Sequence, residues 1–484
     1  MITIQKQEAM NSDRVLEIFR EITKIPRESG HEEKITGYLQ NFAKEHGLEC
    51  RTDATGNVVI TKPASAGKEN VPPIALQSHQ DMVCEKIAGS RHDFNTEPIR
   101  YVIKDGWMIA EETTLGADDG IGIAATLALL SSDLPTGKVE GLFTISEETG
   151  MDGAMDIKPG FIESHTLLNL DSEDEGQIFV GCAGGIDTTA VFRYAEENVK
   201  PGYAPVRLTV SDAIGGHSGD DINKERANAV QILARFLYKE LANIQLLSMD
   251  GGNKRNAIAR DSSATVCVPE KDIDSFIGRY ASFAEDIRRE FHNTDPDVKL
   301  EACRCASSEK AVESAVARRF VLSLMAVNHG VLAMSQDIPG LVETSTNLAA
   351  VKMDTPGEIR VLTSQRSSSD SEKEFMAGKV EAAFLLAGAE VTHSDPYPGW
   401  TPNMESPILK ETVASYRKLF GTEPEVKAIH AGLECGLFLE KFPYLDMVSF
   451  GPTLRGVHAP GEKLDLASNE KFVKLLVDVV TNFK

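Results

Sequence analysis

Short apolar runs alternate with helical segments along the first part of the chain. The runs NVVITK, PPIALQSH, EGLFTISEE and HTLLNLDSE have the length of single strands, and a glycine-bounded helical stretch from Gly120 to Leu130 lies between two of them. Runs of this kind predict buried strands, and strands that alternate with helices pack as one sheet covered by helices. The sequence therefore predicts an α/β fold for this region.

The pattern changes after Asp187, which indicates a second domain inserted into the first. The strand candidates there are VRLTV, SSATVCVPE, DVKLEACRC, LAAVKMDT and EIRVLTSQR. Helices are expected over 223–241, 272–289, 310–327 and 371–386. The Pro- and Gly-rich segment HSDPYPGWTPNMES then marks the crossing back. We expect one discontinuous domain, residues 1–187 and 398–484, with residues 188–397 as the α/β insert.

Composition excludes several classes of function. The chain has 484 residues, which is too long for a single hydrophobic core. Its 50 Lys and Arg residues against 73 Asp and Glu residues give a net charge of -23. This charge argues against nucleic acid or an anionic membrane as a partner. No apolar stretch predicts a membrane span and no secretory signal precedes the first helix, so we expect a cytoplasmic protein. The Cys303-x-Cys305 pair is interpreted as structural.

Histidine and acidic residues follow several of the predicted strands. The relevant motifs are SHQDM, LGADDGIG, SEETG, NLDSEDEG and, far downstream, RGVHAPGE. Because ligands gather at the carboxyl ends of strands in open α/β sheets, these side chains are expected to meet. Taken singly each motif is weak: SHQDM could be a surface turn, ADDG a helix N-cap, and the pair Glu147 and Glu148 an exposed loop. Adjacent buried carboxylates nevertheless raise one another's pKa unless a cation is present, which favours a metal site.

These five motifs, in this order and spacing, resemble the co-catalytic zinc peptidases that include aminoacylases, carboxypeptidases and dipeptidases. Within that family the chain is most similar to the aminoacyl-histidine dipeptidases, also called cytosol nonspecific dipeptidases, because the IPRESGHEEKI start and the DAIGGHSGDDIN stretch are present as well. The resemblance runs from end to end. It implies a catalytic domain with a mixed central sheet flanked by helices, and an inserted lid and dimerisation domain.

The resemblance also implies a two-metal site. His79 and Asp171 would hold one divalent ion, Glu148 and His458 the other, and Asp118 would bridge them. Zinc is the expected metal, with cobalt and manganese as alternatives. The residues alone leave Asp118 and Asp119 open as the bridge, and only the resemblance selects Asp118.

Catalysis and substrate binding are assigned by the same resemblance. Asp81 would orient His79, and Glu147 would act as the general base. His217 in GGHSG would stabilise the oxyanion from the insert of a partner subunit, which makes a homodimer the expected assembly. Asn256 and Arg366 would bind the substrate, with Arg366 suited to a free carboxylate. Taken without the resemblance, His217 is more typical of a turn, and Arg366 could be a surface residue.

The resulting expectation is a metallopeptidase that hydrolyses unblocked dipeptides, including Xaa-His dipeptides. An aminoacylase or a carboxypeptidase would carry the same metal core and is the main alternative. Two further alternatives have little support. The GIGIAA segment fits a dinucleotide-binding pattern, but Asp118 and Asp119 stand where the pyrophosphate would approach. A non-catalytic peptide-binding relative is disfavoured because every expected ligand and Glu147 are present.

Overall fold

The computed structural model describes residues 10–306 and 309–484. The chain divides into two compact units. The first contains Met1–Gly181, Pro402–Ala428 and Leu433–Lys484, and the second contains Cys182–Thr401 and Ile429–Gly432. The first unit is thus discontinuous, and its boundaries lie at 181 and 402, where the sequence had suggested 187 and 398. The return of residues 429–432 to the second unit has no counterpart in the sequence-based division.

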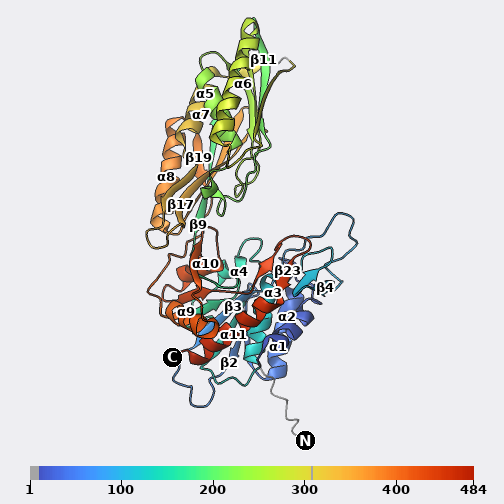
Figure 1. Ribbon diagram of the computed structural model, residues 1–484. Helices are drawn as coiled ribbons and strands as arrows, with labels where there is room; N and C mark the ends of the chain where they lie inside the picture. Colours follow the sequence, from blue (N-terminus) through green and yellow to red (C-terminus); the bar gives the residue numbers. More distant parts are fainter. Residues whose placement is uncertain (1–9, 307–308) are drawn as a thin grey trace. The chain divides into compact units, whose positions relative to one another are not determined.

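An eight-stranded mixed sheet forms the centre of the first unit (Figure 1). Its strands, in order across the sheet, are β1 (Glu49–Thr52), β2 (Val58–Lys62), β6 (Val139–Thr144), β3 (Ile74–His79), β7 (Thr166–Asn169), β21 (Asp446–Ser449), β8 (Gln177–Cys182) and β20 (Glu425–Ile429). The four middle strands β6, β3, β7 and β21 are parallel neighbours. Strands β3 and β6 are buried along their whole length, as expected for parallel strands covered on both faces. The predicted α/β class with a mixed central sheet is confirmed.

Helices and a small sheet complete the first unit. The helices are α1 (Ser12–Ile22), α2 (Glu33–His46), α3 (Ala117–Leu130), α4 (Asp152–Asp156), α9 (Pro407–Phe420), α10 (Glu434–Lys441) and α11 (Leu466–Asn482). The four-stranded sheet has the order β22 (Leu454–Arg455), β23 (Lys463–Asp465), β5 (Trp107–Ala110), β4 (Tyr101–Lys104). Helix α3 is buried on all sides, packing on β3 and on α1, and its first turn carries Asp118. No helix among the described residues is long and apolar enough to cross a bilayer.

The second unit is built on a nine-stranded antiparallel sheet. Its strands are β9 (Gly184–Arg193), β11 (Tyr203–Ser211), β12 (Gln245–Gly251), β13 (Ser262–Pro269), β14 (Lys299–Arg304), β16 (Gly330–Met334), β17 (Val342–Lys352), β18 (Glu358–Ser367) and β19 (Glu390–His393). The helices are α5 (Ala229–Glu240), α6 (Ile273–Glu290), α7 (Ser314–Ala326) and α8 (Asp370–Leu386), with 3-10 turns η1 (Ile222–Lys224) and η2 (Glu270–Asp272). Strands β10 (Glu196–Asn198) and β15 (Lys310–Val312) form a separate ribbon.

Eight strands of this sheet form two halves with the same topology, and the ninth, β16, pairs with β17. The order β14-β11-β13-β12 in one half is the order β19-β9-β18-β17 in the other, and each half carries two of the helices. The halves join where Gly251 of β12 pairs with Val351 of β17.

Two of the helices predicted in this region begin later than expected. The helix predicted from Asn223 starts at Ala229, because the Asn228 side chain accepts a hydrogen bond from the Gln231 amide and caps it. The helix predicted from Lys310 starts at Ser314, because Lys310–Val312 pair with β10 instead.

Candidate metal centre

Several of the predicted metal ligands lie at the ends of neighbouring strands, at one edge of the central sheet. His79 is the last residue of β3, and Asp171 lies just beyond the end of β7. Glu148 follows β6 after a short turn, and Asp118 lies in the first turn of α3. His458 lies between β22 and β23 of the small sheet. Because β3, β6 and β7 run parallel, the residues at their carboxyl ends share one edge of the sheet.

The five predicted ligands form one connected cluster centred on Asp118. One oxygen of Asp118, Oδ1, lies 2.9 Å from His79 Nε2. The other, Oδ2, lies 3.1 Å from His458 Nε2. His79 Nε2 is also 3.4 Å from Asp171 Oδ1, and His458 Nε2 is 2.9 Å from the Glu148 carboxylate. Asp118 therefore faces a histidine and carboxylate pair on each side, one with each of its oxygens.

Asp119 has a different environment from its neighbour Asp118. Its side chain is buried, and its Oδ1 accepts a hydrogen bond of 3.1 Å from the Gly122 amide inside α3. The structure thus brings Asp118, and not Asp119, to both histidines.

Asp81 contacts His79 Nδ1 through its backbone carbonyl, at 3.1 Å, and through its carboxylate. Its Oδ1 lies 3.3 Å from His79 Nδ1, and its carboxylate also accepts hydrogen bonds from Ser29 Oγ and from the amides of Glu147 and Glu148. Burial acts to raise the pKa of Asp81, but the hydrogen bonds from His79, Ser29 and the Glu147 amide outweigh it and lower the pKa to about 2. With Nδ1 of His79 facing Asp81, its Nε2 faces the carboxylates of Asp118 and Asp171.

The donor set fits divalent cations. His79, Asp118 and Glu148 each offer one ligand atom, and these atoms lie within 4.8 Å of one another. Burial raises the pKa of both Asp171 and Glu147 well above the usual range, and Asp118 adds to this effect in each case. Because two histidines cannot balance this many buried carboxylates, the cluster lacks positive charge, which bound cations would supply. Imidazole nitrogen and carboxylate oxygen are the ligands found in catalytic zinc sites.

The carboxylate of Glu147 differs from that of its neighbour Glu148 in its contacts. No hydrogen bond to this carboxylate is found among residues 10–306 and 309–484, although its backbone amide is held by Asp81. The side chain of Glu148, by contrast, contacts His458. Only the Glu148 side chain of this pair is thus held by a hydrogen-bonding partner within the described residues.

Glu434, at the start of α10, is a buried carboxyl near this centre that sequence reasoning missed. It accepts hydrogen bonds of 2.7 Å from Gln77 Nε2 and 2.9 Å from Thr144 Oγ1, on the strands that lead to His79 and Glu147. Burial raises its pKa to about 7. Its motif, HAGLECG, follows no strand with an obvious metal-ligand pattern, so nothing local marked it.

The predicted substrate-binding residues lie together within the second unit. His217 pairs with Ala257, next to Asn256, and the Ser218 amide donates a 2.8 Å hydrogen bond to the Asn256 carbonyl. Arg366 on β18 donates a 3.0 Å hydrogen bond to the Tyr397 hydroxyl and is buried. His217 Nδ1 lies 3.4 Å from Asp220 Oδ2, and His217 and, more weakly, Arg366 lower the pKa of that carboxylate.

His430 also belongs to this group, although no pattern in the sequence pointed to it. It is buried, and its Nε2 lies 2.7 Å from Ser345 Oγ. Burial, reinforced by Arg366, lowers its pKa to about 3, so the ring is neutral at ordinary pH.

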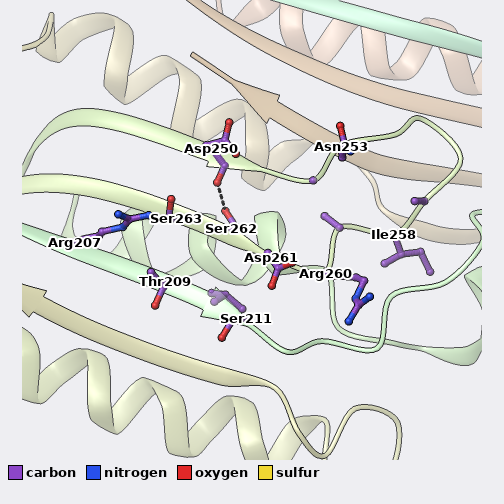
Figure 2. A pocket seen from close by; sticks show the side chains of 14 residues that line it. Arg207, Thr209, Ser211, Asp250, Asn253, Ile258, Arg260, Asp261, Ser262 and Ser263 are labelled. Carbon is purple, nitrogen blue, oxygen red and sulfur yellow. Dashed lines mark hydrogen bonds between the residues drawn. The ribbon is translucent and has the colours of Figure 1, made fainter. Parts of the chain in front are cut away.

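A separate pocket of about 390 Å³ lies in the first half of the nine-stranded sheet (Figure 2). Arg207 and Thr209 of β11, Asp250 of β12 and Ser263 of β13 contribute to its wall. None of the predicted site residues lines it.

Comparison with known proteins agrees with the geometry of the centre. Residues 75–482 match the model of peptidase family M20/M25/M40. The chain is 38% identical over 467 residues, 96% of both chains, to the cytosol non-specific dipeptidase of Escherichia coli K12. The crystal structure of aminoacylhistidine dipeptidase from Vibrio alginolyticus superposes with a TM-score of 0.90 at 38% identity, covering 97% of this chain and 96% of that one.

A more distant structure, aminopeptidase PepT from Bacillus cereus, shares the fold with a TM-score of 0.58 at 17% identity, covering 98% of each chain. Members of the matched family are metal-dependent and generally carry two metal ions. The family match and the 38% identity over nearly the whole length lead to one conclusion: this chain belongs to peptidase family M20/M25/M40.

Proposed function

We propose that this peptidase hydrolyses the peptide bond of unblocked dipeptides, including Xaa-His dipeptides, with two divalent metal ions, zinc being the expected one. The observation that carries the proposal is the position of Asp118, whose two oxygens each face one histidine and carboxylate pair. The dipeptidase activity named for the Escherichia coli and Vibrio alginolyticus relatives supports the substrate class. The name of the former also supports a cytoplasmic location.

The residues of the cluster divide into two metal-binding groups. His79 and Asp171 would hold one ion, Glu148 and His458 the other, and Asp118 would bridge them. Two such ions would lower the pKa of a shared water and polarise the scissile carbonyl. Asp81 keeps His79 in the orientation that presents Nε2 to its ion.

Glu147 is proposed as the general base. Its carboxylate is free of protein hydrogen bonds within the described residues, and its neighbour Glu148 contacts His458. It can therefore accept a proton from the attacking water and pass it to the leaving amine, while Glu148 serves as a ligand.

The second unit is proposed to recognise the substrate. Arg366 is a planar cation suited to the free C-terminal carboxylate of a dipeptide, and Asn256 would add an amide contact. His217 would stabilise the oxyanion from the insert of a partner subunit in a homodimer.

Replacement of His217 by alanine should lower kcat by about two to three decades, the usual loss when one oxyanion donor is removed, without changing metal content. Turnover with a dipeptide and metal analysis of the same sample measure the two effects. Wild-type turnover in this variant would remove the catalytic role.

A separate experiment tests whether His217 of one subunit acts in the active site of the other. If His217 acts across subunits, mixing inactive Glu147→Gln chains with His217→Ala chains and allowing them to exchange restores sites that contain an intact Glu147 and an intact His217. Activity above the sum of the two separate variants is expected. No gain, with subunit exchange demonstrated, would place His217 in the site of its own chain.

The substrate class is tested with a panel of Xaa-His dipeptides, other dipeptides, tripeptides and N-acetyl amino acids, assayed on the purified protein with its metal content measured. We expect hydrolysis of the unblocked dipeptides alone, because both charged ends of the substrate must be matched. Efficient cleavage of N-acetyl amino acids would instead indicate an aminoacylase, and trimming of longer peptides a carboxypeptidase.

A further inference from the structure

A buried arginine holds the loop that carries Asp118. Arg27, in the segment before α2, is 2% exposed. Its guanidinium donates hydrogen bonds to the carbonyls of Gln80 and Asp81, at 3.0 and 2.5 Å, and to the carbonyl of Gly116. It therefore ties the segment that follows His79 to the loop just before Asp118.

A buried glutamate holds the same loop through its amides. Glu462, four residues after His458, is 2% exposed. Its Oε2 accepts from the Leu115 and Gly116 amides at 2.8 and 3.1 Å, and its Oε1 accepts from the Ala117 amide at 2.8 Å. The Asp118 amide also donates to Oε1, at 3.5 Å, so four consecutive amides bind one carboxylate.

The glycines of this loop make the approach of Arg27 possible. A Cβ placed on Gly116 or on Gly120 would lie 2.6 Å from an Arg27 nitrogen. Gly116 also has a φ of +70°, in the left-handed region that favours glycine. The guanidinium of Arg27 can therefore approach the loop only because these two positions have no side chain.

We infer that Arg27 and Glu462 are positioning residues that set the direction of the Asp118 carboxylate, so that each of its oxygens faces one of the two histidines. The inference rests on the proposed function, because it assigns these residues a role toward the metal ions that Asp118 would bridge. Arg27 donates hydrogen bonds to carbonyls in and beside the loop, and Glu462 accepts hydrogen bonds from the amides of the loop. The backbone at Asp118 is therefore fixed by two buried side chains.

A role in fold stability alone is the competing explanation. Burying a charged side chain costs free energy even when it is hydrogen-bonded, so fold stability by itself gives little reason for burying Arg27 and Glu462 here. The hydrogen bonds of both side chains go to backbone atoms of residues 80–81 and 115–118, at and beside the ligands His79 and Asp118. The placement of the bonds therefore favours positioning of the two ligands.

The chain offers a matched control in Glu140. This carboxylate is also buried, and it accepts hydrogen bonds from the Glu163 amide and from the Ser164 amide and hydroxyl at 2.9, 2.9 and 2.6 Å. It lies near the start of β6, at the end of that strand away from Glu147 and Glu148. Glu140→Gln and Glu462→Gln therefore each weaken a buried carboxylate that binds backbone amides, but only one does so beside a ligand.

The test compares zinc affinity, by titration of the metal-free proteins, and thermal unfolding of the same proteins. An amide cannot accept hydrogen bonds through its nitrogen, so Glu462→Gln leaves at least one loop amide unpaired. We expect its zinc affinity to fall about 10- to 100-fold, as for other residues that orient metal ligands. Excess zinc should restore much of its kcat, and Glu140→Gln should bind zinc as the wild type does.

Wild-type zinc affinity in Glu462→Gln, or an equal loss in Glu140→Gln, would overturn the inference while leaving the proposed function intact. If the wild type itself bound no zinc, the proposed function would fail with it. If Glu462→Gln does not fold, Arg27→Lys is judged by the same criteria, because lysine keeps the charge but lacks the planar fork that reaches three carbonyls.

Discussion

Replacement of Glu147 by glutamine is expected to lower kcat for dipeptide hydrolysis by about two to four decades, the usual contribution of a general base. Glutamine has the same shape but cannot accept the proton from water. No hydrogen bond holds the Glu147 carboxylate within the described residues, so the substitution should leave its surroundings undisturbed. Metal content should therefore stay near that of the wild type, as measured by elemental analysis of the sample used for kinetics.

Glu148→Gln is the matched control for this prediction. The two positions are adjacent, but the Glu148 carboxylate lies 2.9 Å from His458 Nε2 and would be a ligand. This variant should lose metal, and its lost activity should recover in part when metal is added in excess. Normal turnover in Glu147→Gln would show that another group accepts the proton, and loss of metal from it would make Glu147 a ligand.

Asp118→Ala is expected to lose both metal ions. Its two oxygens lie 2.9 and 3.1 Å from the two histidines, and no other carboxylate contacts both of them among the described residues. Removal of the bridge exposes the two ions to each other's charge and takes one ligand from each. Activity should fall to the background of the assay, and elemental analysis should find less than one ion per chain.

Asp119→Asn serves as the control for the bridge. An asparagine oxygen can still accept the hydrogen bond from Gly122, so helix α3 should keep its start. Full metal loading is expected here. The reverse result, a loaded Asp118→Ala protein and a metal-free Asp119→Asn protein, would identify Asp119 as the bridge.

The parallel strands and the residues at their ends could be predicted from the sequence. The apolar runs that end at His79 and near Asp171 are β3 and β7, and the run before Glu147 is β6. A short stretch of sequence is enough for this prediction, because a buried strand is a run of apolar residues and a polar residue directly after it stands out. The neighbouring sequence could not distinguish Asp118 from Asp119, since both are aspartates at the start of the same helix.

The residues around the proposed metal ligands could not be predicted in this way. Arg27 and Glu462 are separated by most of the chain and meet only at the loop before Asp118. In the sequence, Arg27 is simply a charged residue after a proline, and Glu462 a charged residue after a glycine. Glu434 is a similar case, because its partners Gln77 and Thr144 lie on strands far from it in sequence. Long-range pairing of this kind emerges only once the sheet is assembled.

The central claim is that Asp118 bridges two metal ions, and anomalous diffraction from crystals grown with zinc tests it most directly. If Asp118 bridges two ions, we expect two anomalous peaks about 3.5–4 Å apart. One should lie against His79 and Asp171, the other against Glu148 and His458, with one Asp118 oxygen on each. A single peak at full zinc loading, or two peaks without Asp118 between them, would contradict it.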